Sequence, residues 1–383
     1  MTASPWSPSD WPADRHVPGS PPTRPVPSND VTDLLALTAD LVDRPSVSLA
    51  EGPITDHLEA ELRAVPWLVV DRVGDNLVAR TQLDRKQRLV FAGHTDTVPV
   101  NGNGDARIQG DTLWGVGSTD MKSGLAVMFE LARTVAEPVI DVTYVFYAAE
   151  EIAAVHNGLG HLFRDRPDLL TGDVALLGEP TGGAVEAGCQ GSLRIEMTVR
   201  GARAHPARPW MGDNAIHRLG ALLRLVDGYQ QRRPVLAGCE YREALQAVAI
   251  GGGVAANVVP DEATVTLNHR FAPDRTAAEA EASIRELLAP GLRPDDGWEV
   301  VDVADAAPPA VDHPVLSRLI EREGLGVRAK LGWTDVARFA AHGIPAANFG
   351  PGDPLLAHTA EERVERAAVE ATFAALDRLL RRQ

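Results

Sequence analysis

The sequence predicts an α/β protein with a mostly parallel sheet covered by helices on both faces, interrupted by a smaller inserted α+β domain. Three observations predict this fold class. Apolar strands alternate with helices up to about residue 190, half-exposed strands with amphipathic helices follow, and the first pattern returns at about residue 305. The chain has 383 residues, more than the ~250–300 at which single cores usually split, so two domains are expected.

The larger domain is predicted to begin after a flexible extension. Residues 1–30 are rich in proline and serine and lack the apolar core of a signal sequence. The first ordered helix would be capped by Asp30, carry an apolar stripe from Leu34 to Val42 and end before Pro45. The first part of this domain, 31–191, is expected to contain helices at 55–65, 121–136 and 158–170, and strands at 67–73, 76–82, 88–93, 143–148 and 173–180.

The inserted domain is predicted over 192–304. Residues 193–200 alternate between apolar and polar side chains, as a half-exposed strand should. An amphipathic helix at 214–231, strands within 246–253 and 254–273, and a helix at 276–288 complete a β-α-β-β-α-like block. The larger domain resumes over 305–383, with two helices around 331–352 and a final helix at 365–383.

Charge and cysteine content exclude several classes of protein. With 37 basic and 53 acidic side chains, the net charge is −16, which argues against binding to nucleic acid or to anionic membranes. Cys189 and Cys239 are too few for a disulfide framework or a thiolate metal cluster. No run of ~18 apolar residues is present to span a membrane. We therefore expect a cytoplasmic protein.

Acidic and histidine side chains follow the predicted strands at the edge where their carboxyl ends meet. They are His94 and Asp96 after the strand at 88–93, Asp120 before the helix at 121–136, Glu150 and Glu151 after the strand at 143–148, Glu179 at the end of 173–180, and His358 in a late loop. Functional groups of doubly wound sheets gather at this edge. The sequence therefore predicts that these side chains form one cluster.

Each of these residues also has an ordinary structural interpretation. A histidine at a strand end is more often a hydrogen-bonding residue, Asp120 fits a helix N-cap, and Glu179 fits a turn. Adjacent side chains leave an extended strand in opposite directions, so one partner would not neutralise both Glu150 and Glu151. Lys122 is the one basic residue in these motifs, and burying carboxylates without cations is too unfavourable. A divalent metal ion is the simplest counter-charge.

The ligand types indicate a hydrolytic site with two metal ions. Histidine and carboxylate ligands without thiolates suit zinc, cobalt or manganese. Five ligands for two ions require one bridging carboxylate, and two ions about 3.5–4 Å apart can lower the pKa of a shared water to near 7. One acid must stay off the metals to take the proton of that water. One of the two adjacent glutamates would then face a metal and the other the water.

Five ordered motifs carry a resemblance to a known family. They are "HTDTVP", "GVGSTDMKSG", "AAEE", "GEPT" and "AHTAEE". Over about 32–383, the chain resembles the M20-type dinuclear zinc aminoacylases and carboxypeptidases, which implies a zinc-peptidase-like catalytic domain with an inserted lid and dimerisation domain. The stretches "VEAGCQGSLR", "RAHPARPWMGDNAIH" and "AANVVPDEATVTLNHRF" resemble the desuccinylase branch of this family, particularly its actinobacterial form.

The resemblance implies a ligand set. The implied ligands are His94 and Glu179 for one zinc ion, Glu151 and His358 for the second, and Asp120 as the bridge, with Co²⁺ or Mn²⁺ able to substitute. Asp96 would orient His94, and Glu150 would be the general base. The Asp120–Met121 peptide matches one that is cis in relatives.

The resemblance also implies substrate contacts and a partner. His205, which alone would be a loop histidine, matches a residue that reaches from the partner subunit to polarise the scissile carbonyl. A homodimer through the lid is therefore expected. The positions that match substrate-holding residues are Asn257, Arg270, Thr334 and Arg338; without the resemblance, the two arginines would be equally well explained as surface ion-pair residues.

The implied substrate is a small N-acyl amino acid, with N-succinyl-L,L-diaminopimelate as the first choice. One departure affects this choice: many desuccinylases carry arginine where this chain has Cys189-Gln190, so an anion-binding guanidinium is missing there. Either another arginine, Arg203 or Arg208, replaces it, or the acyl preference differs. Another family activity, such as acetylornithine deacetylation or aminoacyl cleavage, is the alternative. A different class, a metal- or peptide-binding protein on an inactive scaffold, would be expected to lack Glu150 or a ligand, and every such position is filled.

Overall fold

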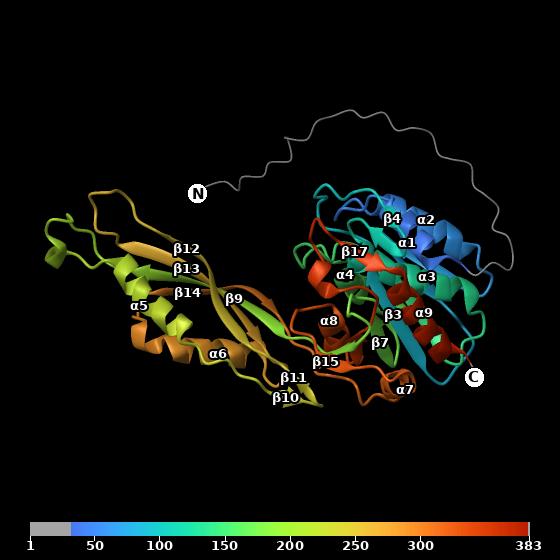
Figure 1. The fold of residues 1–383 in the computed structure, drawn as a ribbon. Helices are drawn as coiled ribbons and strands as arrows, with labels where there is room; N and C mark the ends of the chain where they lie inside the picture. Colours follow the sequence, from blue (N-terminus) through green and yellow to red (C-terminus); the bar gives the residue numbers. More distant parts are fainter. Residues whose placement is uncertain (1–31, 382–383) are drawn as a thin grey trace. The chain divides into compact units, whose positions relative to one another are not determined.

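The structure, a computed structural model, describes residues 32–381. The extension expected at 1–30 and the expected cap Asp30 lie outside the described residues. In this part of the chain, eight strands form the central sheet in the order β1-β2-β6-β3-β7-β16-β8-β15. Figure 1 labels β3, β7 and β15 of this sheet. Their bounds are β1 (Val69–Val73), β2 (Asn76–Arg80), β3 (Arg88–His94), β6 (Asp141–Tyr147), β7 (Val174–Leu177), β8 (Val185–Ala187), β15 (Val327–Ala329) and β16 (Ala346–Asn348).

The four central strands run in one direction. β3 is parallel to both β6 and β7, and β16 is parallel to β7. β8 and β15 are parallel to each other but antiparallel to β16, while β1 and β2 add an antiparallel edge. The expected fold class, α/β with a mainly parallel sheet, is confirmed. Because β6, β3 and β7 are neighbours, their carboxyl ends lie together at one edge.

Helices cover both faces of this sheet, as expected. Their bounds are α1 (Leu34–Val42), α2 (Gly52–Arg63), α3 (Ser123–Thr134), α4 (Gly158–Asp165), α7 (Pro314–Glu323), α8 (Val336–Ala341) and α9 (Arg366–Leu380). Phe91 packs in a core with side chains of α1, α2, α3, α7 and α9, whereas Val90 and Ala92 pack in a second core with those of α4 and α8. Alternate side chains of β3 therefore pack in cores on opposite faces of the sheet, which explains why β3 is apolar along its whole length.

The first helix begins later than the sequence suggested. Asp33, and not Asp30, caps α1: its carboxylate accepts hydrogen bonds from the backbone N–H groups of Leu35 and Ala36 at 3.0 and 3.1 Å. The prediction of Asp30 as the cap is wrong because Asp33 already satisfies the free N–H groups of the first turn.

A second sheet is built from residues between 191 and 304. Its order is β12-β13-β9-β14, with all pairs antiparallel. The bounds are β9 (Gly191–Arg200), β12 (Ala244–Gly252), β13 (Glu262–Phe271), β14 (Gly297–Ala304), α5 (Ala215–Asp227) and α6 (Ala277–Leu288). Figure 1 shows α5 and α6 on the same face, where they pack on alternate residues of β9, such as Ile195 and Met197. The sequence did not predict β14.

Short strands account for most of the remaining differences. The sequence also missed a three-stranded sheet, β4 (Arg107–Gln109), β5 (Thr112–Trp114) and β17 (Arg363–Glu365), and the hairpin β10 (Val235–Leu236) and β11 (Cys239–Glu240). Two or three residues are too few to show a periodic pattern. Over the described part of the chain, none of the helices combines the length and apolar character needed to cross a membrane.

Candidate metal centre

The expected cluster lies at the carboxyl edge of β6, β3 and β7. His94 is the last residue of β3 and is buried. Glu150 and Glu151 follow β6, and Glu179 lies two residues after β7. Gly350, after β16, approaches the backbone of Gly178 and Glu179 so closely that any Cβ there would clash. Four strands and their tight packing therefore place these side chains.

The structure brings six of the expected residues into three overlapping groups. They are His94–Glu150–Glu151, His94–Asp120–Glu179 and Asp120–Glu151–His358, and the donor atoms within each group lie within 4.8 Å of one another. The two carboxylate oxygens of Asp120 contact different histidines: Oδ1 lies 3.2 Å from Nε2 of His94, and Oδ2 lies 3.4 Å from Nε2 of His358. Oε1 of Glu151 lies 2.9 Å from the same nitrogen of His358.

The adjacent glutamates do not diverge as an extended strand would require. Their carboxylate oxygens lie within 4.8 Å of each other and of a nitrogen of His94. β6 ends at Tyr147, and Ala149 adopts a left-handed conformation with φ of 57°. Because this turn breaks the alternation of side chains, the prediction that Glu150 and Glu151 point in opposite directions is wrong.

Asp96 holds the backbone of both glutamates. Its carboxylate accepts hydrogen bonds from the N–H groups of Glu150 at 3.0 Å and Glu151 at 3.1 Å, and from the hydroxyl of Ser48 at 2.7 Å. Nδ1 of His94 lies 3.0 Å from the backbone oxygen of Asp96 and 3.5 Å from its carboxylate. The contact that orients the imidazole is therefore mainly with the backbone carbonyl, which leaves Nε2 free to bind a metal.

Burial and neighbouring carboxylates disfavour the charged forms of two acids of the cluster, Glu150 and Glu179. Burial raises the pKa of Glu150 well above its ordinary value, and the charges of Asp335, Glu179 and Glu151 raise it further against the opposing effect of His94. Burial, followed by the charge of Asp120, raises the pKa of Glu179 to about 7. Oε1 of Glu179 is buried and has no hydrogen-bond partner within residues 32–381. This donor set fits divalent metal ions.

Removing metal ions should make the stability of the folded protein fall as the pH rises from about 5 to 8. Because the pKa of Glu179 is about 7 instead of 4.5, ionisation between these values favours the unfolded chain. At about 1.4 kcal/mol per pKa unit, the loss is on the order of 3 kcal/mol. Thermal unfolding of chelator-treated and zinc-loaded protein at pH 5 and pH 8 measures it. A chelator-treated protein that becomes more stable toward pH 8 would contradict the expected sign.

Asp120 is held by a residue that the sequence did not single out. Oε1 of the buried Glu362 accepts hydrogen bonds at 3.0 Å from the N–H groups of Thr119 and Asp120. Burial raises the pKa of Glu362 to about 7. The motif "AHTAEE" contains this residue, but its contact crosses more than 240 residues of sequence. Lys122, the one nearby cation in the motifs, instead donates to the backbone oxygen of Arg44 at 2.8 Å.

The alternative role of Asp120 as a helix cap is wrong. α3 begins at Ser123, and Asp120 lies in an irregular turn with φ of −116° and ψ of 96°. The Asp120–Met121 peptide is cis, as the resemblance implied. The backbone of Asp120 is therefore shaped by the loop before α3, and its carboxylate is directed at the two histidines.

The residues expected to contact substrate are more dispersed. Thr334 is buried and donates its hydroxyl hydrogen to Oδ1 of Asn348 at 3.1 Å. Nε of Arg338 lies 2.5 Å from the buried Asp335. Arg270, in β13, has no ion-pair partner among the described residues, and burial lowers the pKa of its guanidinium.

The two expected residues from the loops of the second sheet are exposed. Asn257 lies between β12 and β13, and His205 follows β9. In the described part of this chain, the ring of His205 is bonded only by the N–H of Ala207, at 3.1 Å. Among the described residues, His205 belongs to none of the three metal-binding groups.

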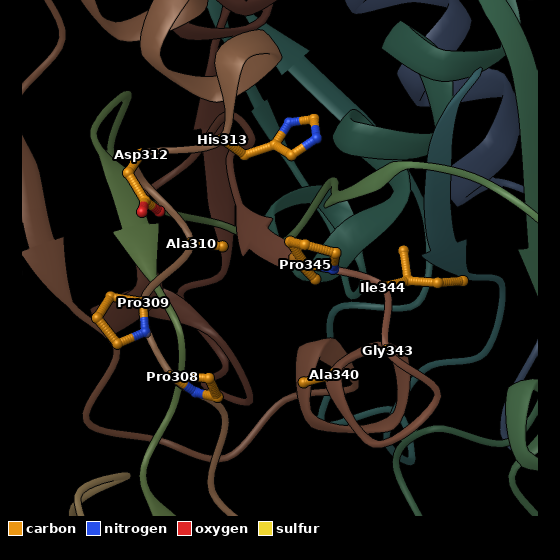
Figure 2. Close-up of a pocket in the computed structure, with 10 residues that line it drawn as sticks. Pro308, Pro309, Ala310, Asp312, His313, Ala340, Gly343, Ile344 and Pro345 are labelled. Atoms are coloured by element: carbon orange, nitrogen blue, oxygen red, sulfur yellow. The ribbon is translucent and has the colours of Figure 1, made fainter. Parts of the chain in front are cut away.

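A cavity of about 460 Å³ lies elsewhere on the larger domain. Figure 2 shows its lining, which is Pro308, Pro309, Ala310, Asp312, His313, Ala340, Gly343, Ile344, Pro345 and Ala346. Residues 343–346 lead into the amino end of β16, which is parallel to β7. The cavity is thus at the edge opposite the metal-binding groups, and none of those groups lines it.

Fold and cluster together define a metal-dependent hydrolase. Comparison with family models makes the class specific: peptidase family M20/M25/M40 matches residues 90–382, and the chain belongs to this family. Among solved structures, a tripeptidase from Staphylococcus aureus has a TM-score of 0.74 at 19% identity and covers 91% of this chain and 97% of its own. The M20 family metallo-carboxypeptidase Sso-CP2 from Sulfolobus solfataricus has a TM-score of 0.69 at 14% identity, with 91% and 98% covered. At these low identities, the two structural similarities show only that the fold is shared.

Curated relatives are more similar in sequence. A Mycobacterium tuberculosis protein described as a candidate succinyl-diaminopimelate desuccinylase, DapE, is 51% identical over 349 residues, which cover 91% of this chain and 98% of that protein. The succinyl-diaminopimelate desuccinylase of Corynebacterium glutamicum is 46% identical over 339 residues, covering 86% and 91%.

Proposed function

We propose that this protein is a dinuclear zinc amidohydrolase that converts N-succinyl-L,L-diaminopimelate and water into succinate and L,L-diaminopimelate. The names of the M. tuberculosis and C. glutamicum relatives support the substrate. The observation that carries the chemistry is the position of Asp120, whose two oxygens contact His94 and His358 separately. A carboxylate placed in this way suits a bridge between two cations.

The proposed ligands follow the two sides of Asp120. His94 and Glu179 would hold one ion, and Glu151 and His358 would hold the other. This division agrees with the groups that contain Glu179 and His358. Zinc is the proposed metal, with Co²⁺ or Mn²⁺ able to substitute, because all donors are nitrogen or oxygen.

Glu150 would move the proton in this reaction. It is the acid of the cluster that the two-ion assignment leaves unused, and it lies beside His94 and Glu151. Bound metal ions would lower the pKa of a water and polarise the scissile carbonyl. Glu150 takes a proton from the attacking water as the water oxygen bonds to the carbonyl carbon. The carbonyl carbon–nitrogen bond then breaks, and Glu150 delivers the proton to the leaving amine. The carboxylate of Asp96 keeps Glu150 in place by accepting a hydrogen bond from the backbone N–H of Glu150.

Turnover measurements on matched substrates test the proposed activity. We expect kcat/KM for N-succinyl-L,L-diaminopimelate to exceed that for acetylornithine and for aminoacyl amides by at least about 10²-fold, because a buried cation left without its carboxylate is unfavourable. Release of the free amine measures all three reactions. Faster hydrolysis of acetylornithine would instead support the alternative family activity, and no hydrolysis by zinc-loaded protein would support the inactive-scaffold alternative.

We further propose that the block over 192–304 is a lid through which two chains form a homodimer. Among the described residues, β12 pairs only with β13, which leaves its outer edge free. Val248 and Ile250 on β12 are 58% and 64% exposed, and Ile216 of α5, next to Gly252, is 41% exposed. An apolar strand edge is a ready surface for pairing with a second copy. In such a dimer, the exposed His205 would act at the metal centre of the partner chain.

A further inference from the structure

Gln190, at the position where the family resemblance implies an arginine, lies beside a partly buried lysine, Lys330. Gln190 is fully buried; its Oε1 accepts a hydrogen bond from the N–H of Arg242 at 3.4 Å, and its Nε2 has no partner among the described residues. The backbone N–H of Gln190 donates to the backbone oxygen of Lys330 at 3.2 Å. Gln190 and Lys330 thus lie on neighbouring backbone segments.

Lys330 directs its ammonium group to the face of the sheet that carries Glu186. It follows β15, whose Arg328 is in register with Glu186 of β8, and Glu186 is in register with Asn348 of β16. Nζ of Lys330 lies 2.8 Å from Oε2 of Glu186. Residues in register share a face, and Asn348 accepts the hydroxyl hydrogen of Thr334, a proposed substrate contact.

The metal-binding groups also act on Lys330 electrostatically. Burial lowers the pKa of its ammonium group, but the charges of Glu186, Glu179 and Asp120 outweigh burial and raise the pKa. The side chain of Lys330 is 14% exposed. Lys330 is therefore within electrostatic reach of two proposed metal ligands.

The local charges leave one cation in excess. Glu186 pairs with two cations, because Nε of Arg328 lies 2.9 Å from its other oxygen. In the proposed metal centre, Glu179 and Asp120 are neutralised by metal ions. One carboxylate then remains for Arg328 and Lys330. A carboxylate of the substrate would restore the balance in this partly buried place.

We propose that Lys330 binds a carboxylate of the substrate and so takes over the role of the arginine missing at Gln190. The proposal rests on the proposed function for the identity of the substrate. Lys330 would be a specificity-determining residue. Replacing it should not unfold the protein, because Arg328 still pairs with Glu186.

The test compares Lys330→Met with Lys330→Arg and with the control Arg328→Gln, which removes the outer cation of the same ion-pair group. Three substrates separate the carboxylates: N-succinyl-L,L-diaminopimelate, its N-butyryl analogue and N-succinyl-1,5-diaminopentane. We expect Lys330→Met to lower kcat/KM for the first roughly 10–10²-fold with unchanged zinc content. Lys330→Arg should recover part of this loss, and Arg328→Gln should keep the selectivity of the wild type.

The pattern of losses identifies the carboxylate. A much smaller loss with the butyryl analogue assigns Lys330 to the acyl carboxylate, and a much smaller loss with the diaminopentane substrate assigns it to a diaminopimelate carboxylate. Both results support the proposal. Equal losses on all three substrates, or no loss on any, would overturn it.

A binding measurement keeps this test separate from the test of the proposed function. A wild-type protein that cleaves none of these substrates refutes the function by itself. Titration calorimetry of zinc-loaded protein with free succinate or free L,L-diaminopimelate needs no turnover. Succinate binding weakened at least about 10-fold by Lys330→Met, and not by Arg328→Gln, would still support a carboxylate site. Equal binding of both free succinate and free L,L-diaminopimelate by the wild type and the Lys330 variant would overturn it.

Discussion

Replacing Glu150 with glutamine should abolish almost all turnover while leaving the metal content unchanged. The amide keeps the size of the side chain but cannot accept the proton of the attacking water. General-base catalysis contributes about 10²–10⁴-fold, so kcat should fall by at least that factor. Glu150 is not one of the proposed ligands, so elemental analysis of the purified variant should still find close to two metal ions per chain.

The neighbouring residue supplies the matched control. Glu151→Gln removes a ligand that lies 2.9 Å from His358, so this variant should lose occupancy of one metal ion. Excess zinc should restore part of the activity of Glu151→Gln and none of the activity of Glu150→Gln. Metal loss from Glu150→Gln together with full occupancy in Glu151→Gln would reverse the two assignments.

Two inactive variants should restore activity when they exchange subunits. His205→Ala lacks the residue proposed to act in the partner chain, and Glu150→Ala lacks the base of its own chain. A heterodimer contains one site with neither defect, because that site draws its base from one chain and its histidine from the other. Mixed protein should therefore regain about a quarter of wild-type activity for random exchange, since half of the dimers are mixed and each has one of two sites intact.

Subunit exchange must be measured independently, for example by native mass spectrometry of differently tagged chains. Proven exchange without recovery would place His205 in the site of its own chain or outside catalysis. A wild-type chain that is a monomer at assay concentration and fully active would contradict the role of the β12 edge as well. Charged substitutions at Ile250, which is 64% exposed on that edge, should lower activity and dimer content together.

The cluster was predictable from the sequence because parallel neighbouring strands end at one edge. Apolar runs identified β3, β6 and β7, and their arrangement brings His94, Glu150 and Glu179 together. The division of roles between Glu150 and Glu151, and the cis peptide after Asp120, came from the family resemblance. The convergence of the two glutamates depends on the left-handed backbone conformation of Ala149, which no residue pattern predicts.

Residues that act through long-range backbone contacts escaped the sequence analysis. Glu362 holds the N–H groups of Thr119 and Asp120, and Lys330 lies beside Gln190, but both contacts join segments more than a hundred residues apart. The strands that position Lys330 and Asn348 contain three residues each. Such short strands are defined by their neighbours in the sheet and not by their own composition.

The central claim is that Asp120 joins two metal ions in one hydrolytic centre. Anomalous diffraction at the zinc edge from a zinc-loaded crystal tests it most directly. The account predicts two zinc peaks about 3.5–4 Å apart, with one oxygen of Asp120 on each. His94 and Glu179 should contact one peak, and Glu151 and His358 the other. A single peak at saturating zinc, or two peaks of which Asp120 contacts only one, would contradict it.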